Sequence, residues 1–478
     1  MHRHQATDSL STPHRDLIPL TTWRRASWRR AAWQRAMLSL FAGLVAIGLA
    51  SQADAQLTAT ALIGDSVSSP DSPRYSDVNE AIKRFTNRDI LSARQFLESA
   101  KRKDPKLPPV GVMLAKMYAI SGNSNAVRPA LEQSIDAESD DPEPYLLLAE
   151  STLAAGQTIE ADALFDKSVQ LVGKYDANAK RKRNLKIRAY RGRAAVAERR
   201  QNWQAAEADL RVWLQEDPDN ANAHTRLGQV LCMLDRTQEG RQAFEKAKQL
   251  DDNLASPFVM TASMYERRGL QAEAIAEFEK AYAQNRDNEV TLVSYAQALI
   301  KNGNLPKAGQ VLKTARAAAP DSFNVWLLTG VTARMAGSYD AAERAFKEAL
   351  ALQPGSRDAY DQMAQTLVAQ DDTDKRARGL QYAGTNSKIY PNNADVKVTL
   401  AWALYQNGRS KEATAELRNA LQTGGGALGA DARVLVAKIL IAGNQTENAR
   451  RLLSSALTEQ RGIFVQRAEA EKLLASLN

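Results

Sequence analysis

The chain of 478 residues has a single cysteine, Cys232, and four histidines, three of which lie within the first 14 residues. One cysteine excludes an internal disulfide and any zinc or iron–sulfur site built from several thiolates. The remaining histidine, His224, has no second histidine with which to form a metal-ligand pair. Phosphate-binding loops and dinucleotide fingerprints are also missing. We therefore expect no cofactor, no metal and no catalytic residue, and we do not expect an enzyme.

A strong charge of one sign is missing outside the N-terminus. The chain has 63 Lys and Arg against 55 Asp and Glu, a net charge of +8. Residues 1–55 hold seven Arg and three Asp, which leaves 56 basic and 52 acidic residues in the rest. Because nucleic-acid-binding proteins usually carry a marked basic excess, nucleic acid is not expected as a partner.

The N-terminal apolar run is short. Met37–Ala50 is an uncharged stretch of 14 residues, preceded by five arginines in WRRASWRRAAWQRA and followed by the small residues Ala53 and Ala55. A bilayer-spanning helix needs about 20 residues. The order of these features is typical of a signal peptide. We expect residues 1–55 to be a signal peptide cleaved before Gln56, giving a periplasmic or secreted protein.

The alternative is an uncleaved anchor in the inner membrane that faces the periplasm, and contact with a membrane is expected only in that case. Residues 56–73, QLTATALIGDSVSSPDSP, are polar and contain several Ser and Pro. This composition favours a loop rather than a packed element. We expect residues 56–73 to form a flexible leader.

Most of the remaining chain repeats every 34 residues. The repeated positions hold alanine, a large apolar residue and glycine: Ala247, Ala281, Ala315 and Ala349; Phe244, Phe278, Leu312 and Phe346; Gly269, Gly303 and Gly337. A constant period of this length predicts a solenoid of helix pairs, in which each pair needs its neighbours to bury its apolar face.

The roles of the repeated positions follow from two antiparallel helices in close contact. In the repeat that starts at Asp321, Gly330 lies in the first helix and would allow the second helix to approach. Gly337 would end the first helix in the left-handed conformation that glycine adopts most readily. Phe346 would lie on the apolar stripe of the second helix. The pattern comprises Trp326, Thr329, Gly330, Ala333, Gly337, Ala342, Phe346, Ala349 and Pro354.

This pattern resembles the tetratricopeptide repeat family, in its bacterial exported form. The resemblance implies an all-α fold, an α-solenoid of about eleven helix pairs over residues 74–478 that forms a right-handed superhelix. The last stretch, IFVQRAEAEKLLASLN, would supply the C-terminal capping helix. The units start near Arg74, Pro108, Pro142, Ile187, Ala221, Ala255, Glu289, Phe323, Arg357, Ala394 and Ala430.

The resemblance also implies a scaffold whose concave groove, lined by the first helix of each pair, holds a peptide or a segment of another protein. The positions extrapolated to this groove are Val293, Gln297, Lys301, Leu327, Val331 and Met335. A mostly apolar groove suits an amphipathic helix or an extended hydrophobic peptide. The alternative is that many of these side chains pack neighbouring first helices together.

Two further features are candidates for recognition. Val398, Trp402 and Tyr405 form a stripe at helical spacing, which suits a binding hot spot or sugar stacking, although such stripes also form cores. Arg188 and Arg191 belong to the basic run KRKRNLKIRAYRGR. This run would suit an anionic partner such as an acidic polysaccharide, or it could be a solvated helix face.

The sequence thus predicts a non-enzymatic protein-interaction scaffold of the bacterial cell envelope that binds a peptide or partner segment in its groove. The alternative is a component of an exopolysaccharide synthesis or export machinery that contacts the polysaccharide, because similar repeat proteins accompany such machinery.

Overall fold

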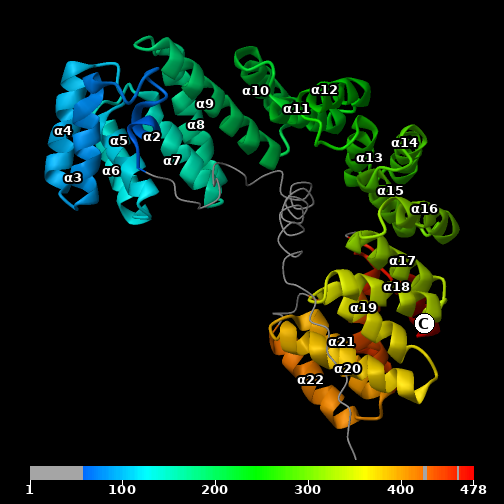
Figure 1. Cartoon of the computed structure of the whole chain (residues 1–478). Coiled ribbons are helices and arrows are strands. Elements are labelled where there is room, and N and C mark those ends of the chain that lie inside the picture. The colour runs from blue at the N-terminus through cyan, green and yellow to red at the C-terminus, as the bar shows by residue number, and fades with distance from the viewer. Residues whose placement is uncertain (1–56, 424–427, 460–461, 478) are drawn as a thin grey trace, which may run out of the picture. The chain divides into compact units, whose positions relative to one another are not determined.

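The computed structural model describes residues 57–423, 428–459 and 462–477. The chain divides into two compact units, the first ending at Glu216 and the second beginning at Asp217. Within the described ranges the secondary structure is entirely helical (Figure 1). The predicted all-α solenoid of helix pairs is therefore confirmed. The expected signal peptide, residues 1–55, lies outside the described residues.

In the first unit, a short helix α2 and one turn of 3-10 helix, η1, precede consecutive antiparallel helix pairs. In each pair, a helix packs most extensively against its neighbour in sequence. The elements are α2 (Ala59–Ile63), η1 (Pro73–Tyr75), α3 (Ser76–Thr86), α4 (Ile90–Lys103), α5 (Val110–Ile120), α6 (Ser124–Ala137), α7 (Pro142–Ala154), α8 (Thr158–Lys174), α9 (Ala179–Arg199) and α10 (Trp203–Glu216).

The second unit continues the same scheme and ends with an unpaired helix, α25, which packs against α24. Its elements are α11 (Ala221–Met233), α12 (Thr237–Leu250), α13 (Pro257–Arg267), α14 (Gln271–Gln284), α15 (Glu289–Lys301), α16 (Leu305–Ala318), α17 (Phe323–Met335), α18 (Tyr339–Leu352), α19 (Arg357–Val368), α20 (Thr373–Ile389), α21 (Ala394–Gln406), α22 (Ser410–Thr423), α23 (Ala430–Ala442), α24 (Thr446–Leu457) and α25 (Arg467–Ser476).

Helix boundaries in the second unit follow local side-chain chemistry. The first helix of most pairs begins after a Ser or Asn whose side chain accepts a hydrogen bond from the backbone N–H three residues later, which satisfies a donor left unpaired at the helix start. These residues are Asn220, Ser256, Asn288, Ser322, Ser356 and Asn393. Gly337 follows the end of α17 with φ of 73°, as the sequence predicted.

The two helices of a pair approach closely at a small residue. A Cβ added to Gly330 on α17 would lie 2.4 Å from the ring of Phe346 on α18. Phe346 is fully buried in a core that extends from α13 to α19. Gly228 and Phe244 repeat the arrangement in the pair α11 and α12, where the corresponding distance is 2.5 Å. The predicted role of Gly330 is confirmed.

Residues 57–72 differ from the flexible leader that we expected for residues 56–73. Leu62 and Ile63 of α2 are fully buried against the first helix pairs. The Lys180 ammonium on α9 donates to the carbonyl oxygens of Gly64 and Val67, at 2.6 and 2.9 Å. The apolar side chains of this stretch cover the start of the solenoid, so its Ser and Pro content did not indicate a mobile segment.

The C-terminal end also departs in part from expectation. Helix α25 buries Ala470 in a core shared with α23 and α24, as a capping helix should. It begins at Arg467, however, and the preceding residues Ile463–Gln466 are not helical.

We predict that Gly330→Ala lowers the free energy of unfolding by about 1–3 kcal/mol, because the added methyl group would overlap the Phe346 ring. The pair α15 and α16 combines alanine at the matching position, Ala296, with Leu312 in place of phenylalanine. We therefore expect Phe346→Leu to remove most of the penalty of Gly330→Ala. Urea unfolding of the single and double variants measures this coupling.

Gly355→Ala is the matched control, because a Cβ at Gly355 has no atom within 4 Å. Its effect should stay within about 0.5 kcal/mol. Equal losses for Gly330→Ala in the wild-type background and in the Phe346→Leu background would contradict the assigned contact.

Candidate functional site

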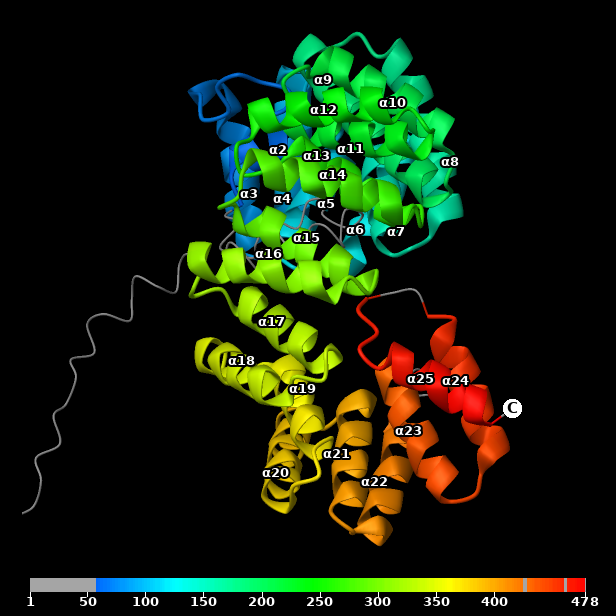
Figure 2. The same ribbon diagram turned by 90° about the vertical axis from the view of Figure 1, so that its right-hand side faces the viewer.

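A cavity of about 430 Å³ lies in the second unit, bordered by the first helices α17, α19, α21 and α23 and by the residues around the start of α25. We call it the terminal groove, and Figure 2 shows the helices that surround it. Its walls combine polar and apolar side chains, among them Arg334, Met335, Gln365, Trp402 and Lys438.

The floor of the terminal groove is a hydrogen-bonded network. The Arg334 guanidinium donates to the side-chain oxygens of Gln362, at 2.5 Å, and Gln365, at 2.8 Å. The amide of Gln365 in turn donates to a carboxylate oxygen of Asp361 at 2.6 Å. Gln365 is only 3% exposed. Two neighbouring repeats are thus joined by polar contacts at the centre of the groove.

Burial perturbs the ionisable groups of this network. It raises the pKa of Asp361 to about 6 against the attraction of the Arg334 charge, and it also raises the pKa of Asp431. Burial lowers the pKa of Arg334 and of Lys438. Arg334 and Lys438 line the cavity, and Asp361 and Asp431 lie outside its lining. Perturbed groups at a cavity are characteristic of functional sites and also of structural networks.

One wall of the terminal groove is aromatic. The rings of Trp402 and Tyr405 stack with centroids 5.9 Å apart and planes inclined by 18°. The Lys438 ammonium lies 5.2 Å from the centre of the Trp402 ring, which favours a cation–π interaction. Lys438 also forms an ion pair with Glu469 of α25 at 2.7 Å.

The segment before α25, residues 463–466, borders the terminal groove, and its residues Val465 and Gln466 line the cavity. The Asp431 carboxylate accepts hydrogen bonds from the backbone N–H groups of Val465, at 3.3 Å, and Gln466, at 2.8 Å. The Gln466 side chain donates to the side-chain oxygen of Gln365 at 3.2 Å and accepts from Lys438 at 3.1 Å. Gln466 is 5% exposed and connects α19 with α23.

The structure brings three of the predicted site residues together here. Met335 and Trp402 line the cavity, and Tyr405 supports Trp402 from one face. Val398, the third member of the predicted stripe, is fully buried in the core between α21 and α23. The stripe is therefore divided between core packing and groove lining, the two alternatives that its helical spacing left open.

The other predicted groove residues lie along the preceding helices. Val293 and Val331 are 2% and 5% exposed and belong to the core, while Leu327 packs against it. Gln297 is half-buried, and Lys301 is exposed and paired with Glu266 at 3.0 Å. Val293 and Val331 thus pack helices together, in agreement with the alternative raised from the sequence, and offer no surface to a partner in this structure.

Arg188 and Arg191 lie on α9 of the first unit. Arg188 donates to both carboxylate oxygens of Glu150, at 3.1 and 2.7 Å, and Arg191 lies 3.7 Å from the same carboxylate. Other cations of the basic run have similar partners: Arg181 with Asp141 and Glu143, Lys186 with Glu216, and Arg193 with Asp166 and Asp209.

The centre of this charge network is almost fully buried. Arg181 is 1% exposed, and the cations Lys116, Arg181 and Arg188 hold the pKa of Glu143 well below its usual range despite the opposing effect of burial. The carboxylates that these arginines need come from α7, α8 and α10, so the basic run cross-links helices of the first unit.

The remaining candidates for chemistry are structural. Cys232 is 1% exposed, and burial raises the pKa of its thiol to about 11, so it carries no thiolate near neutral pH. The His224 ring lies 2.8 Å from the Pro218 carbonyl oxygen. At the same position of a later repeat, the Trp326 indole N–H donates to the Pro320 carbonyl oxygen. Across the described ranges, no cluster of side chains could hold a metal ion.

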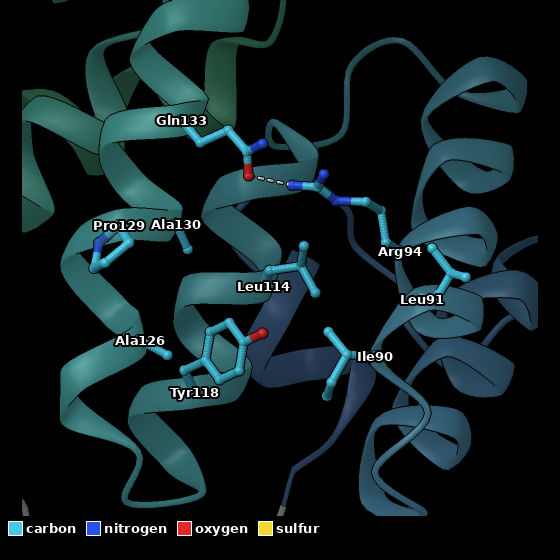
Figure 3. Close-up of a pocket in the computed structure, with 9 residues that line it drawn as sticks. All are labelled: Ile90, Leu91, Arg94, Leu114, Tyr118, Ala126, Pro129, Ala130 and Gln133. Atoms are coloured by element: carbon cyan, nitrogen blue, oxygen red, sulfur yellow. Dashed lines mark hydrogen bonds between the residues drawn. The ribbon is translucent and has the colours of Figure 1, made fainter.

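A second hollow, of about 570 Å³, lies in the first unit between α4, α5 and α6 (Figure 3). Ile90, Leu114 and Tyr118 line it, and Arg94 and Gln133 are hydrogen-bonded across its rim. Leu91 at its edge is 71% exposed. No helix in the described parts of either unit is long and apolar enough to cross a membrane.

Comparisons with known proteins agree with the pairing of helices. Tetratricopeptide repeat sequence models match residues 191–255, 271–330 and 398–462. The family comparison supports tetratricopeptide repeats. The terminal groove lies partly within the last matched stretch. A search of curated proteins gave no significant match.

Solved structures to which the chain is similar include yeast Tom70, which is 14% identical with a TM-score of 0.37; the alignment covers 85% of this chain and 96% of that chain. A tetratricopeptide repeat protein from Parabacteroides merdae is 16% identical with a TM-score of 0.36, covering 61% of this chain and 98% of that one.

Sequence reasoning missed Gln365, Asp431, Lys438 and Gln466. Lys438 and Gln466 interrupt the apolar runs VLVAKILIA and IFVQ, whereas Gln365 and Asp431 lie in stretches that contain other polar residues. A polar residue on a face that should be apolar is a usable signal. It does not, however, reveal which other polar residue it meets.

We predict that Asp361→Asn increases stability more at neutral pH than at acidic pH. The folded protein keeps the Asp361 proton up to about pH 6, whereas an ordinary aspartate loses it near 3.8. Wild-type stability therefore falls through this window as pH rises. The advantage of the variant should grow by about 2 kcal/mol between pH 4 and pH 7.

Urea unfolding at both pH values tests this, and the other titrating groups are common to both proteins. Gln353→Ala, an exposed change that removes no titrating group, is the control and should give a nearly constant difference. A constant difference for Asp361→Asn as well would contradict the assignment.

Proposed function

We propose that this protein is a non-enzymatic interaction scaffold that binds an extended segment of a partner protein in the terminal groove. Tetratricopeptide repeat proteins generally mediate protein–protein interaction, which supports the class of function. The observation that supports the terminal groove as the binding site is the cavity itself, which is lined by apolar and aromatic side chains and by amide and charged ones. Such a combination can bind both the side chains and the backbone of a peptide.

The polar floor suits a peptide backbone. Arg334 and Lys438 line the cavity and carry N–H groups that can donate to the carbonyl oxygens of a peptide. Trp402 and Met335 provide large apolar contact area for the side chains of the bound segment.

The location we propose is the bacterial cell envelope. The support is the sequence order of arginines, Met37–Ala50 and small residues, which favours export and cleavage before Gln56. In this proposal the scaffold is periplasmic or secreted, and an uncleaved chain would instead be tethered at the inner membrane, facing the periplasm.

The second candidate, a component of an exopolysaccharide machinery, has one supporting observation, the stacked pair Trp402 and Tyr405, which could hold a sugar ring. The arginines proposed to attract an acidic polymer, Arg188 and Arg191, are paired with Glu150 instead. A peptide therefore fits the geometry better than a polyanion.

We predict that a photo-cross-linking amino acid at Gln406, which lines the terminal groove, captures a discrete partner in cells. The same group at Ile159, an 80% exposed residue of the first unit, should not capture it. Met335→Asp should abolish the Gln406 product, because it places a charge on the apolar wall.

Salt separates the two candidate functions. Capture of a peptide in a partly apolar groove should persist between about 0.05 and 0.5 M salt, whereas contact with an acidic polymer should weaken steeply as charges are screened. Identical products from Gln406 and Ile159, unaffected by Met335→Asp, would contradict the proposed groove.

We predict that intact-mass measurement of the natively expressed protein finds a chain that begins at Gln56 in the soluble fraction. A full-length chain confined to the membrane fraction would contradict cleavage and support the anchored alternative. This measurement does not depend on the identity of the partner.

A further inference from the structure

We propose that residues 463–466 are an internal ligand of the terminal groove, displaced when a partner presents a segment with the same side-chain pattern: two aliphatic residues separated by one position, followed by glutamine. This inference rests on the proposed function, because it identifies the class of partner and the regulation of that same groove.

The apolar contacts of the segment alternate between two cores. Ile463 and Val465 pack against the core that extends from α13 to α19. Phe464, between them, packs on the other side against the core formed by α23, α24 and α25. Ile463 and Val465 thus contact the core of the earlier repeats, whereas Phe464 anchors the segment to the final repeat.

Part of this contact belongs to the ordinary repeat geometry. In the preceding repeat, the backbone N–H of Gly429 donates to Asp395 at 3.0 Å, as the N–H groups of Val465 and Gln466 donate to Asp431. An aspartate early in one first helix therefore holds the chain just before the next one. This contact alone would make residues 463–466 a simple connection to the capping helix.

The contacts across the groove are not explained by that geometry. Gln466 reaches Gln365 on α19, 101 residues earlier in the chain, and the same Gln365 accepts a hydrogen bond from Arg334 on α17. Gly429, the residue at the corresponding connection, has no side chain to make such contacts. Residues 463–466 therefore cover polar groups of two earlier repeats, in the place where an external segment would bind.

The chemistry of the segment defines the partner. Ile463 and Val465 fit the apolar surface formed by the repeats, and the Gln466 amide uses both of its groups, donating to Gln365 and accepting from Lys438. An external segment would reproduce these contacts if it had an aliphatic residue, then any residue, then a second aliphatic residue and then glutamine. An acidic residue in place of the second aliphatic one would put a carboxylate against the apolar core that Val465 contacts, and should not bind.

The test uses a fluorescein-labelled peptide, GIFVQRAE, which corresponds to residues 462–469, and the full chain. In the variant Ile463→Asp/Val465→Asp the internal ligand should leave the groove. An internal competitor lowers the apparent affinity for the peptide in proportion to the fraction of molecules whose groove is open. We therefore expect the peptide to bind this variant at least about tenfold more tightly than wild type. Fluorescence anisotropy measures both affinities.

Two controls accompany the measurement. Leu421→Asp introduces a charge at an exposed leucine of α22, outside the groove, and should leave the wild-type affinity unchanged. A peptide with aspartate in place of its valine should bind neither protein. Equal affinity of GIFVQRAE for wild type and the double variant would overturn the proposal.

A second measurement avoids the risk that the double variant does not fold. Excess GIFVQRAE added to the wild-type chain should accelerate hydrogen exchange of the Val465 and Gln466 backbone amides, because it releases them from Asp431. Unchanged exchange at saturating peptide would show that the segment is a fixed connection, and the proposal would fail.

The two proposals can fail separately. Peptide binding and hydrogen exchange need no natural partner, so they test the internal ligand even if no cross-linked partner is found at Gln406. Conversely, a partner captured equally by wild type and by Ile463→Asp/Val465→Asp would support the groove and contradict its occupation by residues 463–466.

Discussion

The close contact between the two helices of each pair is the constraint on which the structure depends. Where Gly330 faces Phe346, an aromatic ring lies directly against the backbone of the first helix, and the space exists only because glycine has no side chain. A single pair of this length leaves most of its apolar surface exposed. Stacked pairs bury it together, which is why the core from α13 to α19 is continuous.

Stacking also places the first helices side by side and creates the terminal groove. Polar residues on these helices are then brought into contact across repeats, where each would be costly to bury alone. Arg334, Gln365 and Gln466 satisfy one another, and Asp361 keeps an oxygen that has no hydrogen-bond partner. The C-terminal segment covers part of the groove through Gln466.

The first unit uses charges for a different purpose. The sequence suggested that the basic run could attract an anion, yet Arg181 and Arg188 are held by Asp141, Glu143 and Glu150. The carboxylates lie about 40 positions earlier in the chain, in another repeat. Because the pairing depends on how α9 packs against α7, the spacing of basic residues alone could not distinguish a binding surface from a network that joins helices.

The sequence by itself determined the helix pairs, because the 34-residue period fixes which side chains share a face and which glycines end a helix. Gly330 and Gly337 could be interpreted correctly for this reason. Only the tertiary structure decided which apolar residues are core, such as Val293 and Val398, and which line a cavity, such as Met335 and Trp402. Their exposure depends on neighbouring repeats and on residues 463–466, which cross the groove through contacts about 100 positions apart, and no local pattern encodes such contacts.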